Sequence, residues 1–163
     1  MKKRIGLTFA LLAGSVSLLL AHDLFIKLDT YFLEPNTEIR VPVINGTFET
    51  SENAIAPERV IDISLVTPSW HDRLDTTAWH ARGDTTFVDI RTHEPGTYVL
   101  GASTRPNMIQ LTGEEFNQYL EHDGIPDVLE ARRRNNELDK GARERYHKHV
   151  KAIFQVGDRL TRN

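Results

Sequence analysis

Alternating apolar and polar residues dominate positions 24–104 and predict a series of short β-strands. Val60–Val66 and Thr85–Arg91 are the clearest cases, because in each of them successive side chains would point to opposite faces of a sheet. Turn sequences such as Asn45-Gly46 and Pro95-Gly96 separate the strands at roughly ten-residue spacing. Short strands at this spacing predict a mainly β fold, an immunoglobulin-like antiparallel β-sandwich.

Two further strands are predicted near the start of this zone, at Leu24–Leu28 and Ile39–Ile44. The second contains Pro42, which has no backbone N–H to donate to a neighbouring strand. We therefore expect that strand at the edge of a sheet or beside a β-bulge.

The apolar spacing changes to a helical one at Thr112. Thr112 and Glu115 form a capping-box sequence, and Phe116 and Leu120 follow at helical spacing. Gly124 is a helix-stop signal.

A second helix is predicted to begin at Pro126, with the run Arg132-Arg133-Arg134 on its solvated face. A short third helix is predicted at Ala142–Lys148, and a final strand at Val150–Val156 returns to the sandwich. The chain is thus predicted as one domain over residues 22–163, with a helical insertion at about 112–148 before the last strand.

The first 21 residues have the composition of a secretory signal peptide. Lys2, Lys3 and Arg4 precede an uncharged stretch that ends at Ala21. The apolar run is shorter than the ~20 residues of a membrane-spanning helix. We therefore expect cleavage before His22 and a mature protein that is periplasmic or secreted, and not embedded in a membrane.

Removal of this leader makes the chain distinctly acidic. The leader contains three of the 20 Lys and Arg residues and none of the 23 Asp and Glu residues, which leaves 17 against 23, a formal net charge of −6. This balance argues against a nucleic-acid partner, which needs a basic face. The chain has no Cys, so a thiolate metal site is excluded.

No motif of an enzyme is present: there is no nucleophile elbow, phosphate-binding glycine loop or His-Glu-x-x-His sequence. We therefore expect a protein that is not an enzyme. A catalytic copper or zinc centre at His22 remains an open alternative, but it would need an open coordination position beside an acid or base.

His22 is chemically unusual if cleavage leaves it at the amino terminus. Its free α-amino group and its imidazole could then chelate one metal ion. Such nitrogen donors suit nickel, cobalt, zinc and above all copper. The alternative is that a histidine merely happens to follow the cleavage site.

Two other histidines, His147 and His149, are two positions apart. In an extended strand both would point the same way and could form a chelating pair, whereas in a helix they would diverge by about 200 degrees. The spacing alone does not distinguish a chelating pair from two ordinary surface residues. The remaining histidines are expected in solvated or capping roles.

Six segments, the first at the leader junction and the others in the mature chain, resemble in their order and spacing an uncharacterised secreted bacterial domain family described as similar to periplasmic components of nickel and cobalt uptake systems. They are Ala21–Phe25, Tyr31–Pro35, Asn45–Phe48, Glu94–Val99, Phe116–Leu120 and Arg143–Lys151. The resemblance implies metal binding and carries over His22 as a ligand, while His149 falls within a matching segment.

These observations predict a periplasmic protein that binds a divalent transition metal (nickel, cobalt or copper) and hands it to a membrane uptake system. The expected metal ligands are His22, Asp23 and His149. The alternative is a β-sandwich that binds a protein or carbohydrate without metal. Trp70, Trp79, Tyr31 and Tyr98 could form a sugar-binding ledge, although core or edge positions are expected for them.

Overall fold

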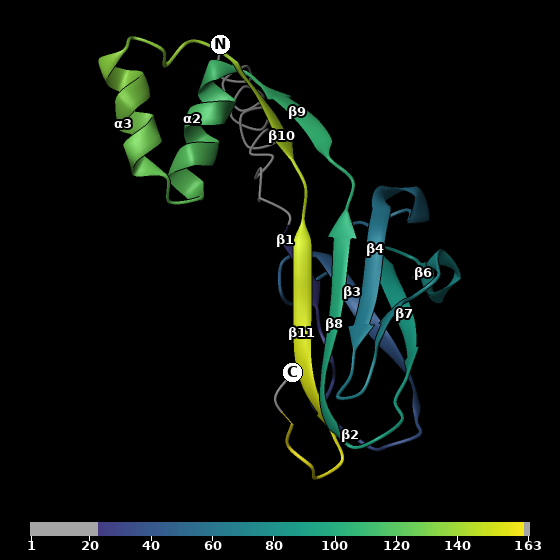
Figure 1. Cartoon of the computed structure of the whole chain (residues 1–163). Helices are drawn as coiled ribbons and strands as arrows, with labels where there is room; N and C mark the ends of the chain where they lie inside the picture. Colours follow the sequence, from purple (N-terminus) through teal and green to yellow (C-terminus); the bar gives the residue numbers. More distant parts are fainter. Residues whose placement is uncertain (1–22, 162–163) are drawn as a thin grey trace, which may run out of the picture.

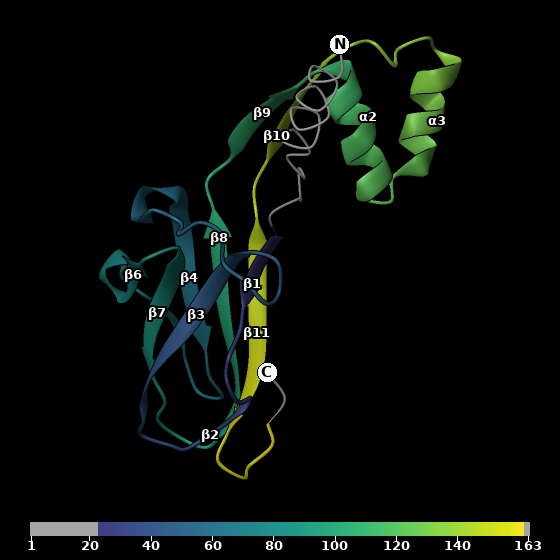
Figure 2. The ribbon, with the colours of Figure 1, turned by 180° about the vertical axis from the view of Figure 1, so that it is seen from behind.

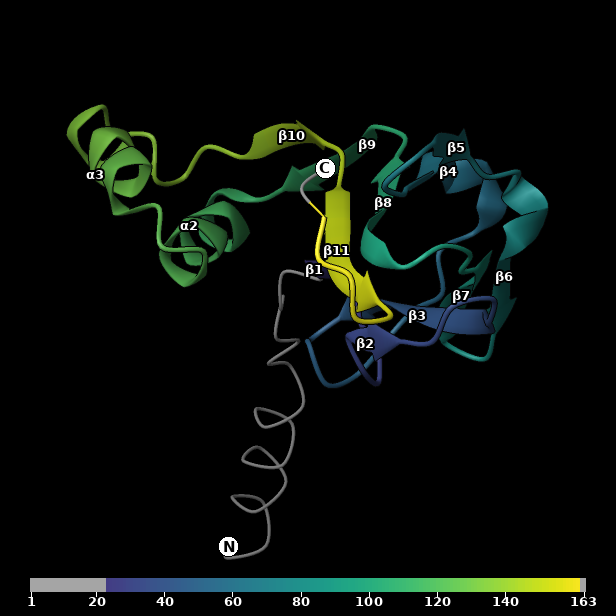
Figure 3. The ribbon, with the colours of Figure 1, turned by 60° about the horizontal axis from the view of Figure 1, so that its bottom comes forward.

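Two β-sheets packed face to face and a projecting arm make up residues 23–161, the part of the chain that the computed structural model describes (Figures 1 and 3). The expected signal peptide, residues 1–21, and His22 lie outside the described residues. One sheet consists of β1 (Asp23–Ile26), β3 (Glu38–Gly46), β7 (Thr85–Arg91) and β6 (Trp79–Arg82), in that order. The other consists of β2 (Phe32–Leu33), β11 (His149–Val156), β8 (Gly96–Thr104), β4 (Val60–Val66) and β5 (His71–Arg73).

All strand pairs except β2 with β11 are antiparallel, which confirms the predicted mainly β sandwich. The core lies between the two sheets and is built from the alternate residues that the sequence pattern marks as apolar. From β3 and β7 it receives Val41, Val43 and Val88, and from β8 and β11 it receives Leu100 and Phe154. All five are at most 2% exposed.

The expectation that Pro42 marks an edge strand or a β-bulge is wrong, because β3 lies between β1 and β7 and pairs with both without a register shift. The carbonyl of Pro42 accepts a hydrogen bond from the backbone N–H of Lys27, which follows the last residue of β1. In an antiparallel strand the nitrogen of a residue points to the same side as its carbonyl. The side of Pro42 that lacks an N–H therefore faces Lys27, just beyond the end of β1. At most one backbone hydrogen bond at the end of that strand pair is lost.

The arm, defined as residues 107–146, contains β9 (Asn107–Leu111), α2 (Gly113–His122), α3 (Pro126–Arg134) and β10 (Ala142–Tyr146). Figure 2 shows it extending from the end of the sandwich. The predicted capping box is present, since Glu115 N–H donates to Thr112 Oγ1 and the Glu115 carboxylate accepts from Thr112 N–H. Within residues 23–161 no helix is both long and apolar enough to cross a membrane.

The third predicted helix is absent, because Ala142–Tyr146 is the strand β10. It pairs antiparallel with β9 from Ala142 opposite Leu111 to Tyr146 opposite Asn107. A five-residue segment has little helical preference of its own, and pairing with a distant strand decides its conformation. The insertion thus combines two helices with a two-stranded sheet.

Arg132 does not lie on a solvated face as predicted, but is only 9% exposed. Its guanidinium donates to Asn117 Oδ1 at 2.9 Å and to the carbonyls of Glu137 at 2.7 Å and Lys140 at 2.6 Å. It also lies over the ring of Phe116, 4.8 Å from the centroid. Arg132 therefore ties the loop after α3 to both helices of the arm.

Tyr119 joins α2 to β10, where its hydroxyl donates to Glu144 Oε1 at 3.4 Å. Burial raises the pKa of Tyr119 to about 12, and the charges of Glu144 and Asp123 add to the rise. Because an unfolded tyrosine titrates near ~10, the folded chain binds the proton more tightly, so stability is expected to fall as the pH rises from about 10 to about 12.

Replacing Glu144 with Gln is expected to lower the pKa of Tyr119, because it removes the nearby negative charge. Tyrosinate absorbance against pH measures this, with Tyr119→Phe to assign the transition among the four tyrosines of the chain. Glu121→Gln, at an exposed carboxylate of the same helix, is the control. An equal shift in Glu121→Gln would contradict the assignment to Glu144.

Candidate metal-binding site

The sandwich and the arm share one two-stranded ribbon with a single shift in register. Ser103 of β8 pairs with His149 of β11, and further along Asn107 of β9 pairs with Tyr146 of β10. Three residues separate the pairs on the first side and two on the second, so the first side is longer by one residue. On the second side only His147 and Lys148 join β10 to β11.

Lys148 keeps the β10–β11 side extended through this junction. Its N–H donates to Thr104 Oγ1 and its carbonyl accepts from Thr104 N–H, both at 2.9 Å. Side chains on an extended chain alternate between its two sides. His147 and His149 therefore share one side, and Lys148 points to the other.

The rings of His147 and His149 are in contact, with centroids 4.5 Å apart and ring planes at 71°. Both side chains are exposed. Along a strand, alternate residues are about 6.6 Å apart, so the two rings lean toward each other. The structure thus forms the close pair that an extended chain allows and a helix would not.

Ser103 orients one ring of this pair, because its Oγ lies 2.8 Å from His149 Nδ1. When Nδ1 carries the ring proton and donates it to Ser103 Oγ, the lone pair of Nε2 is left to bind a metal ion. A metal-binding histidine usually donates its other N–H to an oxygen in this way. Ser103 could not be recognised from the sequence, since it lies 46 positions from His149 and only the pairing of β8 with β11 brings the two residues together.

Asp23 lies near Lys148 rather than in the histidine pair. Burial lowers the pKa of Lys148, and the negative charge of Asp23 partly opposes this effect. Lys148 Nζ also donates to Asn45 Oδ1 at 3.1 Å. Because Lys148 and His149 point to opposite sides of the chain, Asp23 interacts with the side away from the ring of His149. No group of three or more His, Asp or Glu side chains suited to a metal ion forms within residues 23–161.

The other histidines of the described chain lie apart from this pair, and most have an aromatic or acidic neighbour of their own. They are His71 in β5, His80 stacked on Phe87 and 3.7 Å from Asp89, His93 against Trp70, and His122 beside Asp123 at 3.5 Å. Each is therefore placed as a surface residue, separate from the other histidines.

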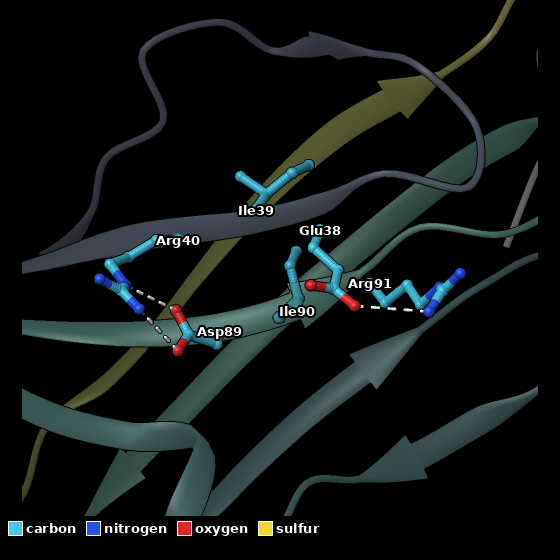
Figure 4. A pocket seen from close by; sticks show the side chains of 6 residues that line it. All are labelled: Glu38, Ile39, Arg40, Asp89, Ile90 and Arg91. Atoms are coloured by element: carbon cyan, nitrogen blue, oxygen red, sulfur yellow. Dashed lines mark hydrogen bonds and ion pairs between the residues drawn. The ribbon is translucent and has the colours of Figure 1, made fainter.

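An open pocket of 390 Å³ lies on a different surface, between β3 and β7 (Figure 4). Arg40 pairs with Asp89 at 2.8 Å and Arg91 with Glu38 at 3.4 Å across its floor. The hydrogen bond from Arg40 lowers the pKa of Asp89. Each charge in this pocket already has a partner on the neighbouring strand, so the pocket is a weaker candidate than the histidine pair.

Comparison with known proteins gives no match: no protein-family model, curated protein or solved structure matches the chain. The resemblance to the secreted bacterial family described above therefore stays a prediction. The case for a site rests on the geometry of His147, His149 and Ser103.

Proposed function

We propose that the mature protein acts in the periplasm or outside the cell by binding a divalent transition-metal ion at His147 and His149. The contact between the two exposed rings carries this proposal, because two imidazoles held side by side supply two nitrogen donors without a change of fold. The hydrogen bond to Ser103 supports it by fixing the orientation of His149. The proposal is for binding and not for catalysis.

The donor set favours nickel, cobalt or copper over calcium and magnesium, which prefer oxygen ligands. The chain has no thiolate to offer, and imidazole suits copper most strongly among these ions. The amino group and imidazole of His22 are the further donors expected from the sequence, with Asp23 as an additional candidate. The family resemblance suggests that the bound ion is passed to a membrane uptake system.

Metal titration by calorimetry tests the pair directly. His147→Ala and His149→Ala are each expected to weaken binding of Cu(II) or Ni(II) by about 100-fold or more, and Ser103→Ala by about 10-fold, since losing a supporting partner typically costs 10- to 100-fold. His71→Ala is the matched control, because it removes an exposed histidine from another strand. Unchanged affinity in both His147→Ala and His149→Ala would refute the site.

A second pair of proteins tests the contribution of His22. One begins at His22 and the other carries one extra residue before it, which removes the free amine from the chelate. Weaker binding by the extended protein supports a shared site. Equal binding by the two proteins leaves His147 and His149 as the site and excludes the His22 chelate.

The alternative function, recognition of a protein or carbohydrate without metal, is favoured by one observation, the projecting arm. The sugar-binding ledge receives little support, because two of its four aromatic residues are in the core: Trp79 is 2% exposed and Tyr98 is fully buried. Trp70 is partly buried against the core, and Tyr31 is 39% exposed. The arm therefore favours a protein partner over a sugar.

A further inference from the structure

A stripe of basic side chains follows the edge that the arm and the sandwich share. From Arg143 to Ile153, exposed residues alternate strictly with less exposed ones. Six positions are exposed, and five of them are basic: Arg143, Arg145, His147, His149 and Lys151, which we name the basic stripe; the sixth is Ile153. In a chain that is acidic overall, five basic residues thus lie along one side of a single extended segment.

The fixed charges of the basic stripe have no acidic partners within residues 23–161. None of Arg143, Arg145 and Lys151 forms an ion pair there. Their cross-strand neighbours are uncharged: Arg143 pairs with Gln110, Arg145 with Met108 and Lys151 with Gly101.

On β3, β5 and β7, arginines are neutralised by acidic residues of neighbouring strands. Arg40 pairs with Asp89, and Arg91 with Glu38, directly across β3 and β7. Arg73 of β5 likewise pairs with Asp62 of β4. The arginines of the basic stripe differ in this respect from those of β3, β5 and β7, whereas Arg82 of β6 likewise forms no ion pair within residues 23–161.

The backbone beside the basic stripe also has an open edge. β10 pairs only with β9. β11 pairs with β8 on one side, and on the other with β2 only at Gln155 and Val156. Between Ala142 and Phe154, no strand of the described chain is hydrogen-bonded to this second edge, although β1 packs close to β11, so β10 provides the clearest open part of it.

We propose that this edge binds an extended acidic peptide segment of a partner protein as an added β-strand. The backbone of the segment would pair with the open edge of β10 and β11, as in other cases of strand addition. Alternate residues of a strand are about 6.6 Å apart, so Asp or Glu at every second position would match the repeat of the basic stripe. Opposite charges on paired strands stabilise the pairing.

The open backbone edge is the reason to favour a peptide over another polyanion. A nucleic acid or sulfated glycan could neutralise the arginines, but it has no strand to add to β10 and β11. Arg143, Arg145 and Lys151 are not candidate metal ligands, so this inference does not rest on the proposed metal site.

Fluorescence anisotropy with metal-free protein and a labelled peptide tests the proposal. The probe is a peptide of about nine residues that alternates Asp and Thr, since nine residues at 3.3 Å each span the basic stripe. The double variant Arg143→Glu/Arg145→Glu is expected to bind at least about tenfold more weakly than the wild type. Arg82→Glu/Arg159→Glu changes the net charge equally at exposed sites off the basic stripe and is expected to bind within about twofold of the wild type.

A second peptide keeps the composition but places all Asp residues in one block, and an oligothymidylate of equal charge serves as a further polyanion. Tighter binding of the alternating peptide than of both competitors supports strand addition. Equal binding of either competitor, equal loss in the two double variants, or no binding of the alternating peptide would overturn the proposal. Circular dichroism of both variants establishes that they are folded.

Discussion

Replacing Arg132 with Ala is expected to unfold the arm while the sandwich stays folded. The guanidinium makes hydrogen bonds to Asn117 Oδ1 and to the carbonyls of Glu137 and Lys140. Its removal leaves Asn117 Oδ1 and the Lys140 carbonyl without this donor, at about 1–3 kcal/mol for each one that stays buried, whereas the Glu137 carbonyl keeps its hydrogen bond from Lys140 N–H. It also removes the cation that lies over Phe116. We expect the arm to lose about 3–5 kcal/mol of folding stability in total, which is more than so small a part of the chain can lose and stay folded.

Hydrogen exchange followed by mass spectrometry measures this effect region by region. Amides of residues 107–146 should lose protection in Arg132→Ala, and those of β8 and β11 should keep it. Arg133→Ala is the control, since its neighbouring guanidinium is exposed and pairs only with Glu130. Equal loss of protection in the two variants would mean that the contacts of Arg132 do not hold the arm together.

Replacing Phe154 with Ala is expected to lower the free energy of unfolding of the whole sandwich by about 3–5 kcal/mol. Phe154 is 2% exposed and its ring lies 5.6 Å from that of Tyr98 in the centre of the core. The change leaves a cavity between the two sheets that the surrounding strands cannot fill. Denaturation with urea, followed by tryptophan fluorescence, measures the loss.

Ile153→Ala is the matched control, one residue away on the same strand. Ile153 is 56% exposed, so its truncation should cost less than about 1 kcal/mol. Similar losses in the two variants would contradict the assignment of Phe154 to the core.

The strands of the sandwich were predictable because each carries its own signal. Thr85–Arg91 was predicted with the bounds that β7 has, since its alternation begins after one turn and ends before another. The capping box of α2 was predictable for the same reason, because its two residues are only three positions apart. The conformation of β10 was not predictable in this way, because it depends on pairing with β9 about 35 positions earlier.

The histidine pair of the candidate site was also only partly predictable from the sequence. The sequence offered His147 and His149 as a pair only on condition that the segment is extended, and the predicted helix at Ala142–Lys148 obscured that condition. The burial of Arg132 was missed for a related reason. Its partners lie in a loop and on another helix, and the charges next to it in sequence are exposed.

The pairing of Thr104 with Lys148 marks both the place where the arm leaves the sandwich and the place where it returns. Everything between these two residues is, in topological terms, one long excursion from a hairpin whose two strands are β8 and β11. A tight turn could replace it without disturbing the pairing of any strand in the two sheets. In evolution, such an arrangement lets the arm change in length or in binding partner while the fold of the sandwich is preserved.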